Sequence, residues 1–207
     1  MKKWFVCLII LSSFFCPKVH AKMISHDFNG IIYVEESTVS ELEELFQKHN
    51  YRYFRAMENG AFPAIFVQKL PTDFAQIESQ KYRNELFIRI LTPLALKINE
   101  ELFNERHALL RLERSLNKNN KLSEQEISKL EELALKYDYF YRAHDDSRPV
   151  NLIKNLKLRI DVIPPSILIA VAAMETNWGF SRVAQEANSL YKEKIWYTEE
   201  GLEPLEN

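Results

Sequence analysis

Glu175 is the residue whose type and position best suit catalysis. It follows an unbroken apolar run, residues 167–174, and precedes Thr-Asn-Trp-Gly. The run predicts a helix buried on every face, with Gly179 as its C-terminal stop. Apolar surroundings and the negative end of a helix dipole both raise the pKa of a carboxyl, and a general acid for glycosidic cleavage must be protonated near neutral pH. Trp178 would offer an apolar wall to a sugar ring.

A structural explanation of Glu175 stays open beside the catalytic one. A glutamate at the end of a buried helix can also be a cap partner, or mark the point where a core helix frays. Pro164 and Pro165 precede the apolar run, and proline suits the first turn of a helix but not its interior. The helix that presents Glu175 should therefore begin at these prolines.

The composition predicts a mainly α protein. Only four glycines occur among 207 residues, beside many Leu, Glu and Lys. We expect a signal peptide over residues 1–21, a small mixed α/β region over 22–72, a helical region over 73–143 and a last segment over 144–207. The order is then a small α+β region, long helices and a final α-domain.

Short motifs mark the elements of the mixed region. Residues 31–34 and 64–67 are short β-prone runs. Between them, the spacing of Thr38 and Glu41 is that of a capping box, which opens a helix through Phe46.

The helical region carries a second set of signals. Pro93 either kinks one long helix or begins another. The spacing of Ser123 and Glu126 repeats the capping-box pattern and opens a further helix. Charged residues are expected on the solvent side of the helix that follows Pro93: Glu100, Glu101, Arg106, Arg111 and Arg114.

The first residues are typical of a cleaved signal peptide. Lys2 and Lys3 precede an apolar run over residues 4–15, which is shorter than the roughly 20 residues of a membrane-spanning helix. Small residues near Ala21 suit cleavage there, and a lipoprotein anchored at Cys16 is the alternative. We expect a periplasmic or secreted protein without stable membrane insertion after cleavage.

Charge and cysteine content limit the partners. Both cysteines, Cys7 and Cys16, fall inside the expected signal, so the mature chain has neither a disulfide nor a thiol ligand. Loss of the three lysines of the signal changes the net charge from −2 to −5. This balance argues against nucleic acid or an anionic membrane as the main partner. The sequence does not indicate an oligomeric state.

Two further clusters admit a functional and a structural interpretation. The first is aromatic and could stack on sugars, although packing between helices is favoured: Tyr137, Tyr139, Phe140 and Tyr141. The second could bind a cation, but it lacks partner ligands at helical spacing and reads as a solvated loop: His144, Asp145 and Asp146.

The blocks Asp161-Val-Ile-Pro-Pro-Ser166, Ala172-Ala-Met-Glu-Thr-Asn-Trp-Gly179 and Ser181-Arg-x-Ala-x-Glu186 resemble the Bax-type proteins. These are relatives of the flagellar-type glucosaminidases, the mannosyl-glycoprotein endo-β-N-acetylglucosaminidase-like proteins of the lysozyme superfamily. The region around Asn99 and Arg106 looks like the helices that precede their catalytic domain. The resemblance implies that residues 144–207 are the N-terminal half of a lysozyme-like glucosaminidase domain.

The resemblance also implies an activity and its residues. The activity is hydrolysis of the β-1,4 bond after N-acetylglucosamine in the glycan strands of peptidoglycan, without a metal or organic cofactor. The catalytic glutamate of the family falls on Glu175. Residues that would line the sugar cleft are Trp178, Asn188, Leu190, Tyr191 and Trp196.

Departures from the family pattern keep other functions open. Lys192 stands where the family has glycine, and the chain ends soon after Gly201, so the domain looks truncated at its C-terminus. Glu199 or Glu200 would be the second catalytic carboxylate, or else part of a solvated acidic tail. The alternatives to hydrolysis are a non-catalytic remnant that binds glycan or a periplasmic partner, and a lytic transglycosylase.

Overall fold

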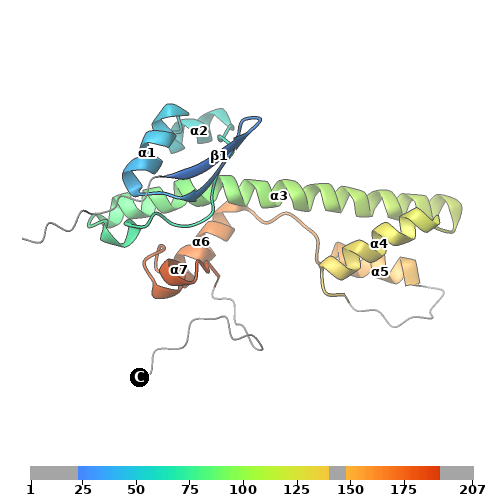
Figure 1. The fold of residues 1–207 in the computed structure, drawn as a ribbon. Helices are drawn as coiled ribbons and strands as arrows, with labels where there is room; N and C mark the ends of the chain where they lie inside the picture. Colours follow the sequence, from blue (N-terminus) through green and yellow to red (C-terminus); the bar gives the residue numbers. More distant parts are fainter. Residues whose placement is uncertain (1–22, 140–147, 192–207) are drawn as a thin grey trace, which may run out of the picture.

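The computed structural model of the protein describes residues 23–139 and 148–191. This part is mostly helical, with one three-stranded sheet near its start, which confirms the mainly α class (Figure 1). Two lobes share one long helix, α3 (Gln80–Asn119), which runs through both. Among the described helices, none is both long and apolar enough to cross a membrane. The expected signal over 1–21 lies outside the described residues.

The sheet begins with a hairpin. Strands β1 (Ile24–Phe28) and β2 (Ile31–Glu36) pair antiparallel across Asn29 and Gly30, both with positive φ, as a two-residue turn requires. Strand β3 (Ile65–Val67) adds parallel to β2. The two β-prone runs expected from the sequence are thus confirmed. Strand β1 was not anticipated, because every residue in it is exposed and its pattern carries no buried face.

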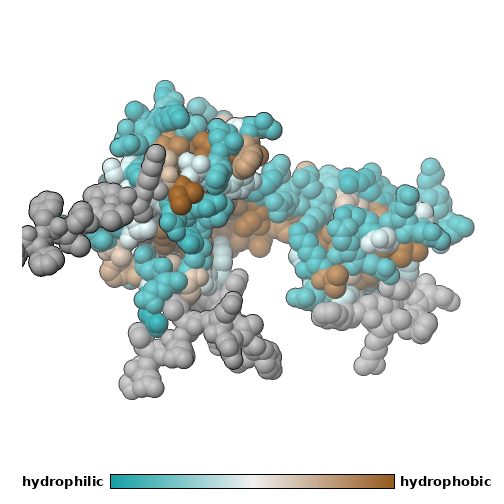
Figure 2. Space-filling view, in the orientation of Figure 1, coloured by the Kyte–Doolittle hydropathy of each residue, from teal (hydrophilic) through white to brown (hydrophobic). Residues whose placement is uncertain are grey.

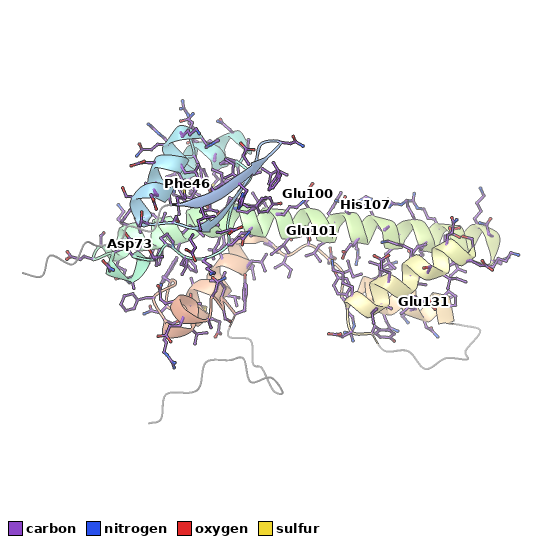
Figure 3. All side chains as sticks on the ribbon, in the orientation of Figure 1. Phe46, Asp73, Glu100, Glu101, His107 and Glu131 are labelled. Carbon is purple, nitrogen blue, oxygen red and sulfur yellow. The ribbon has the colours of Figure 1, made fainter. Side chains whose placement is uncertain are left out.

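Helix α1 (Val39–Lys48) begins at the expected capping box. The backbone N–H of Glu41 donates to Thr38 Oγ1 at 3.3 Å, and the Thr38 N–H donates to the Glu41 carboxylate at 2.8 Å. The first N–H of the helix donates to Asp73 Oδ1 at 2.7 Å, just before the short helix η1 (Phe74–Gln76) (Figure 3). Side chains therefore hold the start of α1 against a segment 34 residues further along the chain.

Helix α3 continues through Pro93 without a break, so Pro93 does not begin a new helix. Because proline has no N–H, the carbonyl of Arg89 four residues earlier loses its helical partner. Tyr51 Oη donates a hydrogen bond of 3.0 Å to that carbonyl. Beside it, Thr92 Oγ1 donates to the Ile88 carbonyl at 2.7 Å. Tyr51 thus supplies a hydrogen bond that the helix itself cannot make.

The first core lies in the first lobe, where the sheet, α1, α2 (Tyr53–Asn59), the first part of α3 and α6 (Pro165–Thr176) meet. Phe46 points into this lobe (Figure 3). The buried residues of the first core are Ile32, Val34, Leu42, Leu45, Phe46, Tyr51, Ala56, Ile65, Val67, Phe74, Leu86, Phe87, Ile90, Leu91, Ile169, Ala172 and Ala173.

The second core lies where the distal half of α3 packs on α4 (Glu124–Lys136) and α5 (Arg148–Lys157). Helix α4 begins at the expected capping box of Ser123 and Glu126. The second core is aliphatic: Leu109, Leu112, Leu122, Leu130, Leu133, Ala134, Leu152, Ile153, Leu156 and Ile160. Helix α5 thus belongs to one lobe and α6 to the other, although they follow each other in the chain.

The described members of the aromatic cluster pack on the second core. Tyr137 Oη donates to the Glu105 carboxylate at 2.5 Å, and Tyr139 Oη accepts from Asn155 Nδ2 at 2.8 Å. Packing between helices, the favoured interpretation, holds for these two tyrosines. Phe140, Tyr141 and the His-Asp-Asp cluster lie outside the described residues.

Candidate functional site

Helix α6 has two apolar faces, and only one of them is covered. Its inner face packs on α3 in the first core. The other face carries an exposed stripe at helical spacing, formed by Ile167, Val171 and Met174, with Met174 81% exposed. The expectation of a helix buried on every face is therefore wrong for the described structure, because its neighbours cover one side only. Figure 2 shows hydrophobic surface beneath α3, between the two lobes.

The chain leaves α6 through a left-handed turn. The helix ends at Thr176, and Asn177, Trp178 and Gly179 have φ of 49°, 58° and 76°. The C-terminal stop is thus Asn177, two residues before the glycine expected from the sequence. Hydrogen bonds of 2.8 Å from the N–H groups of Trp178 and Ser181 to carbonyls of the last helical turn close it.

Thr176 and Gly179 lock this turn from inside. Thr176 is fully buried; its Oγ1 donates to the Ala172 carbonyl at 2.6 Å and accepts from the Gly179 N–H at 2.9 Å. A Cβ on Gly179 would lie 3.0 Å from side-chain atoms of Leu70, Phe74 and Phe87. Both the backbone conformation and the space therefore require glycine here.

Glu175 lies in the last turn of α6, next to this locked segment. Its side chain is half-buried, between the exposed Met174 and the buried Thr176. Val171, one turn earlier on the helix, belongs to the exposed stripe. Glu175 is thus partly open to solvent, while the hydrogen bonds of Thr176 and Gly179 fix the backbone that follows it.

Trp178 packs into the first lobe. Its indole meets the Phe87 ring edge-to-face, with ring centroids 6.1 Å apart and planes at 71°, and it is half-buried against the first core. Packing against the first core thus covers part of the ring that we expected to contact a sugar. The part that remains exposed is what a ligand could contact.

The other expected cleft residues follow the short helix α7 (Arg182–Glu186). Asn188 Nδ2 donates to the Gln68 carbonyl at 2.7 Å, and Leu190 packs on the first core. Tyr191 Oη donates to the Leu168 carbonyl of α6 at 3.2 Å, and partial burial raises the pKa of this phenol. These contacts hold the segment against α6 and the end of β3. Trp196, Glu199 and Glu200 lie outside the described residues, as does Lys192.

The block around α7 that carries the family resemblance has structural roles. Ser181 caps α7, since its Oγ accepts from the Ala184 N–H at 3.3 Å. Arg182 pairs with Glu186 at 2.9 Å along the helix. Gln185 Nε2 donates to the Gly179 carbonyl at 2.6 Å, which ties α7 back to the turn after α6.

Two side chains of α3 fix the connection that leads into α6. Asn99 makes a pair of hydrogen bonds with the backbone of Ile163: its Nδ2 donates to the carbonyl at 2.6 Å and its Oδ1 accepts from the N–H at 2.9 Å. Arg106 Nη1 donates to the carbonyls of Lys157 and Ile160. Arg106 is therefore half-buried and engaged, not a purely solvated charge as its place in the helix pattern predicted. The carbonyls that accept its hydrogen bonds lie more than 50 residues away in the chain, so no local pattern reveals them.

Within the described ranges, no group of three or more His, Cys, Asp or Glu side chains could hold a metal ion. At the end of α6 the chain supplies one carboxyl group, that of Glu175, on a helix that carries an exposed apolar stripe and is followed by the half-buried Trp178.

Comparison with known proteins gives one distant similarity. The chain is 27% identical over 119 residues to Protein bax of Escherichia coli (strain K12). The similarity covers 58% of this chain and 41% of that protein, so the chain spans less than half the length of its relative. No protein-family model matches the chain. No solved structure matches it either.

Proposed function

We propose that this protein hydrolyses the glycan strands of peptidoglycan, with Glu175 as the general acid. The observation that carries the proposal is the placement of Glu175: a half-buried carboxyl on a locked helix end, beside the exposed stripe of α6. The similarity to Protein bax supports it, together with the resemblance of the surrounding blocks to Bax-type glucosaminidases.

In the proposed reaction, Glu175 donates its proton to the glycosidic oxygen as the bond between that oxygen and the anomeric carbon breaks, and water supplies the oxygen that the anomeric carbon gains. The exposed stripe and the free edge of Trp178 would pack against the apolar faces of the sugar rings. Asn99 and Arg106 act as positioning residues, because they hold the backbone that enters α6. Glu199 or Glu200 remains the proposed second carboxylate.

The proposal places the protein in the periplasm or outside the cell. Peptidoglycan lies there, and residues 1–21 have the charge and apolar pattern of an export signal. The substrate partner is then a glycan strand, not a nucleic acid or a lipid surface.

The experiment is release of new reducing ends from purified peptidoglycan by the wild-type protein and by Glu175→Gln. Because loss of a general acid costs on the order of 10²–10⁴ in rate, Glu175→Gln should be at least about 100-fold slower. Glu186→Gln is the matched control: Glu186 is exposed on α7, where it pairs with Arg182 of the same helix, and the variant should keep the wild-type rate. Equal rates for Glu175→Gln and the wild type would rule Glu175 out as the acid.

A second function, glycan binding without cleavage, is favoured by one observation. The described helices leave the stripe on α6 uncovered, whereas a glycosidase excludes water from its acid during the reaction. Glycan pull-down without any new reducing end from the wild-type protein would decide for binding. Anhydro sugar products, detected by mass, would decide for a lytic transglycosylase.

A further inference from the structure

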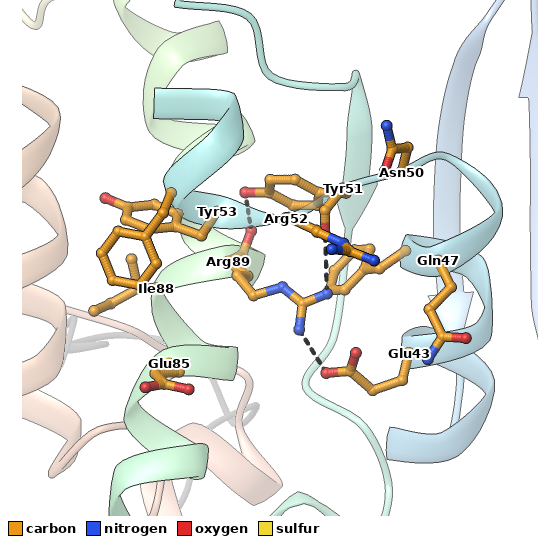
Figure 4. A pocket seen from close by; sticks show the side chains of 11 residues that line it. Glu43, Gln47, Asn50, Tyr51, Arg52, Tyr53, Glu85, Ile88 and Arg89 are labelled. Atoms are coloured by element: carbon orange, nitrogen blue, oxygen red, sulfur yellow. Dashed lines mark hydrogen bonds and ion pairs between the residues drawn. The ribbon is translucent and has the colours of Figure 1, made fainter. Parts of the chain in front are cut away.

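Helices α1 and α2 lie on the opposite side of α3 from α6 (Figure 1), and they carry a second candidate site. A pocket of about 670 Å³ opens between α1, the turn before α2 and the first part of α3 (Figure 4). This volume is within the range of small-molecule sites in proteins. None of the residues that line this pocket belongs to the site around Glu175.

The floor of the pocket is a fixed guanidinium. Arg89 stacks with its Cζ 4.5 Å from the centre of the Phe46 ring. Its Nη1 donates to the Glu43 carboxylate at 2.6 Å, and its Nη2 donates to the Tyr51 carbonyl at 3.2 Å. Tyr51 is held in turn by the carbonyl that Pro93 leaves without a helical partner. A ligand would therefore meet a preorganised floor, which lowers the entropy lost on binding.

The wall of the pocket is aromatic and open to solvent. Tyr53 and Phe54 stand edge-to-face with centroids 5.6 Å apart, and both line the pocket with Ile88. Phe54 is 67% exposed, although a large aromatic side chain gains most from burial. An exposed aromatic surface at the mouth of a pocket is typical of a binding site.

The charged side chains that line the pocket, on its floor and around its edge, are balanced in sign. Glu43 and Glu85 contribute two negative charges, and Arg52 and Arg89 contribute two positive ones. Gln47 and Asn50 are neutral amides, so every charged or amide side chain of the lining ends in a planar group that can form paired hydrogen bonds. A site with equal numbers of both charges favours a neutral ligand that carries many hydroxyl or amide groups, because an ion would meet one like charge for each opposite one.

We infer that this pocket binds a neutral pyranose sugar of a glycan strand, away from Glu175. A pyranose has apolar C–H faces that pack on aromatic rings, and equatorial hydroxyls around its edge that match planar donors and acceptors. Tyr53 and Phe54 receive the face of the sugar, and Glu85, Gln47 and Asn50 receive its hydroxyls. The choice of a glycan strand as the source of the sugar rests on the proposed function.

The test measures binding of N-acetylglucosamine oligosaccharides by calorimetry, in the Glu175→Gln protein so that no cleavage intervenes. Phe54→Ala and Glu85→Ala should each weaken binding at least about tenfold, because the first removes an aromatic contact with the sugar face and the second removes an acceptor for its hydroxyls. Phe103→Ala is the matched control: its ring is 53% exposed on α3, where it contacts His107 and not the pocket, and the affinity should not change. Circular dichroism checks that the variants fold, which the exposure of both pocket side chains favours.

Three results would overturn the inference. The first is no oligosaccharide binding at millimolar concentration, and the second is equal affinity in the parent protein, Phe54→Ala and Glu85→Ala. The third is tighter binding of a tri-lysine peptide than of the oligosaccharide, which would mark a site for cations. Oligosaccharide binding that depends on Phe54, in a wild-type protein that releases no reducing ends, would keep this inference and remove the proposed catalysis.

Discussion

The two lobes share α3 but are packed in different ways. The second core is built from aliphatic side chains of three helices and of the segments next to them, with ion pairs and tyrosines at its edge. The first core joins a sheet and helices, and it contains two close individual contacts. Gly179 packs against three side chains, and the Tyr51 hydroxyl donates to the Arg89 carbonyl. Both candidate sites lie on the first lobe. The close fits and the two candidate sites therefore lie on the same lobe, while the second lobe packs on the distal half of the long helix.

Gly179→Ala tests the close packing of the first lobe and should give the largest loss of stability. The positive φ costs about 1–2 kcal/mol for a residue with a Cβ, and the overpacking against Leu70, Phe74 and Phe87 adds about 1–3 kcal/mol. Gly60→Ala is the matched control, because Gly60 also has positive φ but has nothing within 4 Å of the added Cβ. Urea unfolding should show a clearly larger loss for Gly179→Ala. Equal losses would mean that the contacts of residue 179 with Leu70, Phe74 and Phe87 add nothing to the cost of the positive φ.

Tyr51→Phe tests the fit around Pro93 and should have a smaller effect. The change leaves the Arg89 carbonyl without a partner, which costs about 1–3 kcal/mol of unfolding free energy for a buried group. In a Pro93→Ala background the new N–H can take that carbonyl, so the same change should cost much less. A double-mutant cycle of urea unfolding measures the coupling. Additive losses would show that the tyrosine does not replace the missing helical hydrogen bond.

Glu105 should give the second lobe a small dependence on acid. Burial raises the pKa of Glu105, but hydrogen bonds from Lys136 and Tyr137 outweigh it, so the pKa lies below its ordinary value. The folded state then binds the proton less well than the unfolded state. Its contribution to stability is present above the unfolded pKa and is lost as the pH falls through the folded one. Unfolding between pH 7 and pH 3 should show a shallower acid slope for Glu105→Gln, and an unchanged slope would exclude this origin.

Local signals in the sequence were enough for much of the fold. Both capping boxes, the strands β2 and β3 and the helical character of α3 and α4 follow from residues close together in the chain. The exposure of α6 did not follow, because an apolar helix reads the same whether its outer face is covered or not. At Pro93 the free carbonyl of α3 is paired with Tyr51, which lies 38 residues away in the chain, and no periodicity in the sequence predicts such a pairing.

The candidate site was predictable in part for the same reason. The sequence placed Glu175 at the end of a helix, and the structure has it there. It could not show that Trp178 packs on Phe87, or that Asn99 and Arg106 fix the entry to α6, because these contacts join distant segments. The pocket over Arg89 was missed altogether. The aromatic run Tyr51-Arg-Tyr-Phe54 contributes to this pocket, but in the sequence it looks like a run of ordinary buried core residues.

The most direct test of Glu175 as an acid compares two leaving groups. A sugar leaving group needs a proton from the enzyme, whereas a dinitrophenolate leaves without one. We predict that Glu175→Gln slows cleavage of N-acetylglucosamine oligosaccharides at least about 100-fold but slows cleavage of their dinitrophenyl glycosides far less. Equal losses on both substrates, or no loss on either, would contradict a role for Glu175 as general acid.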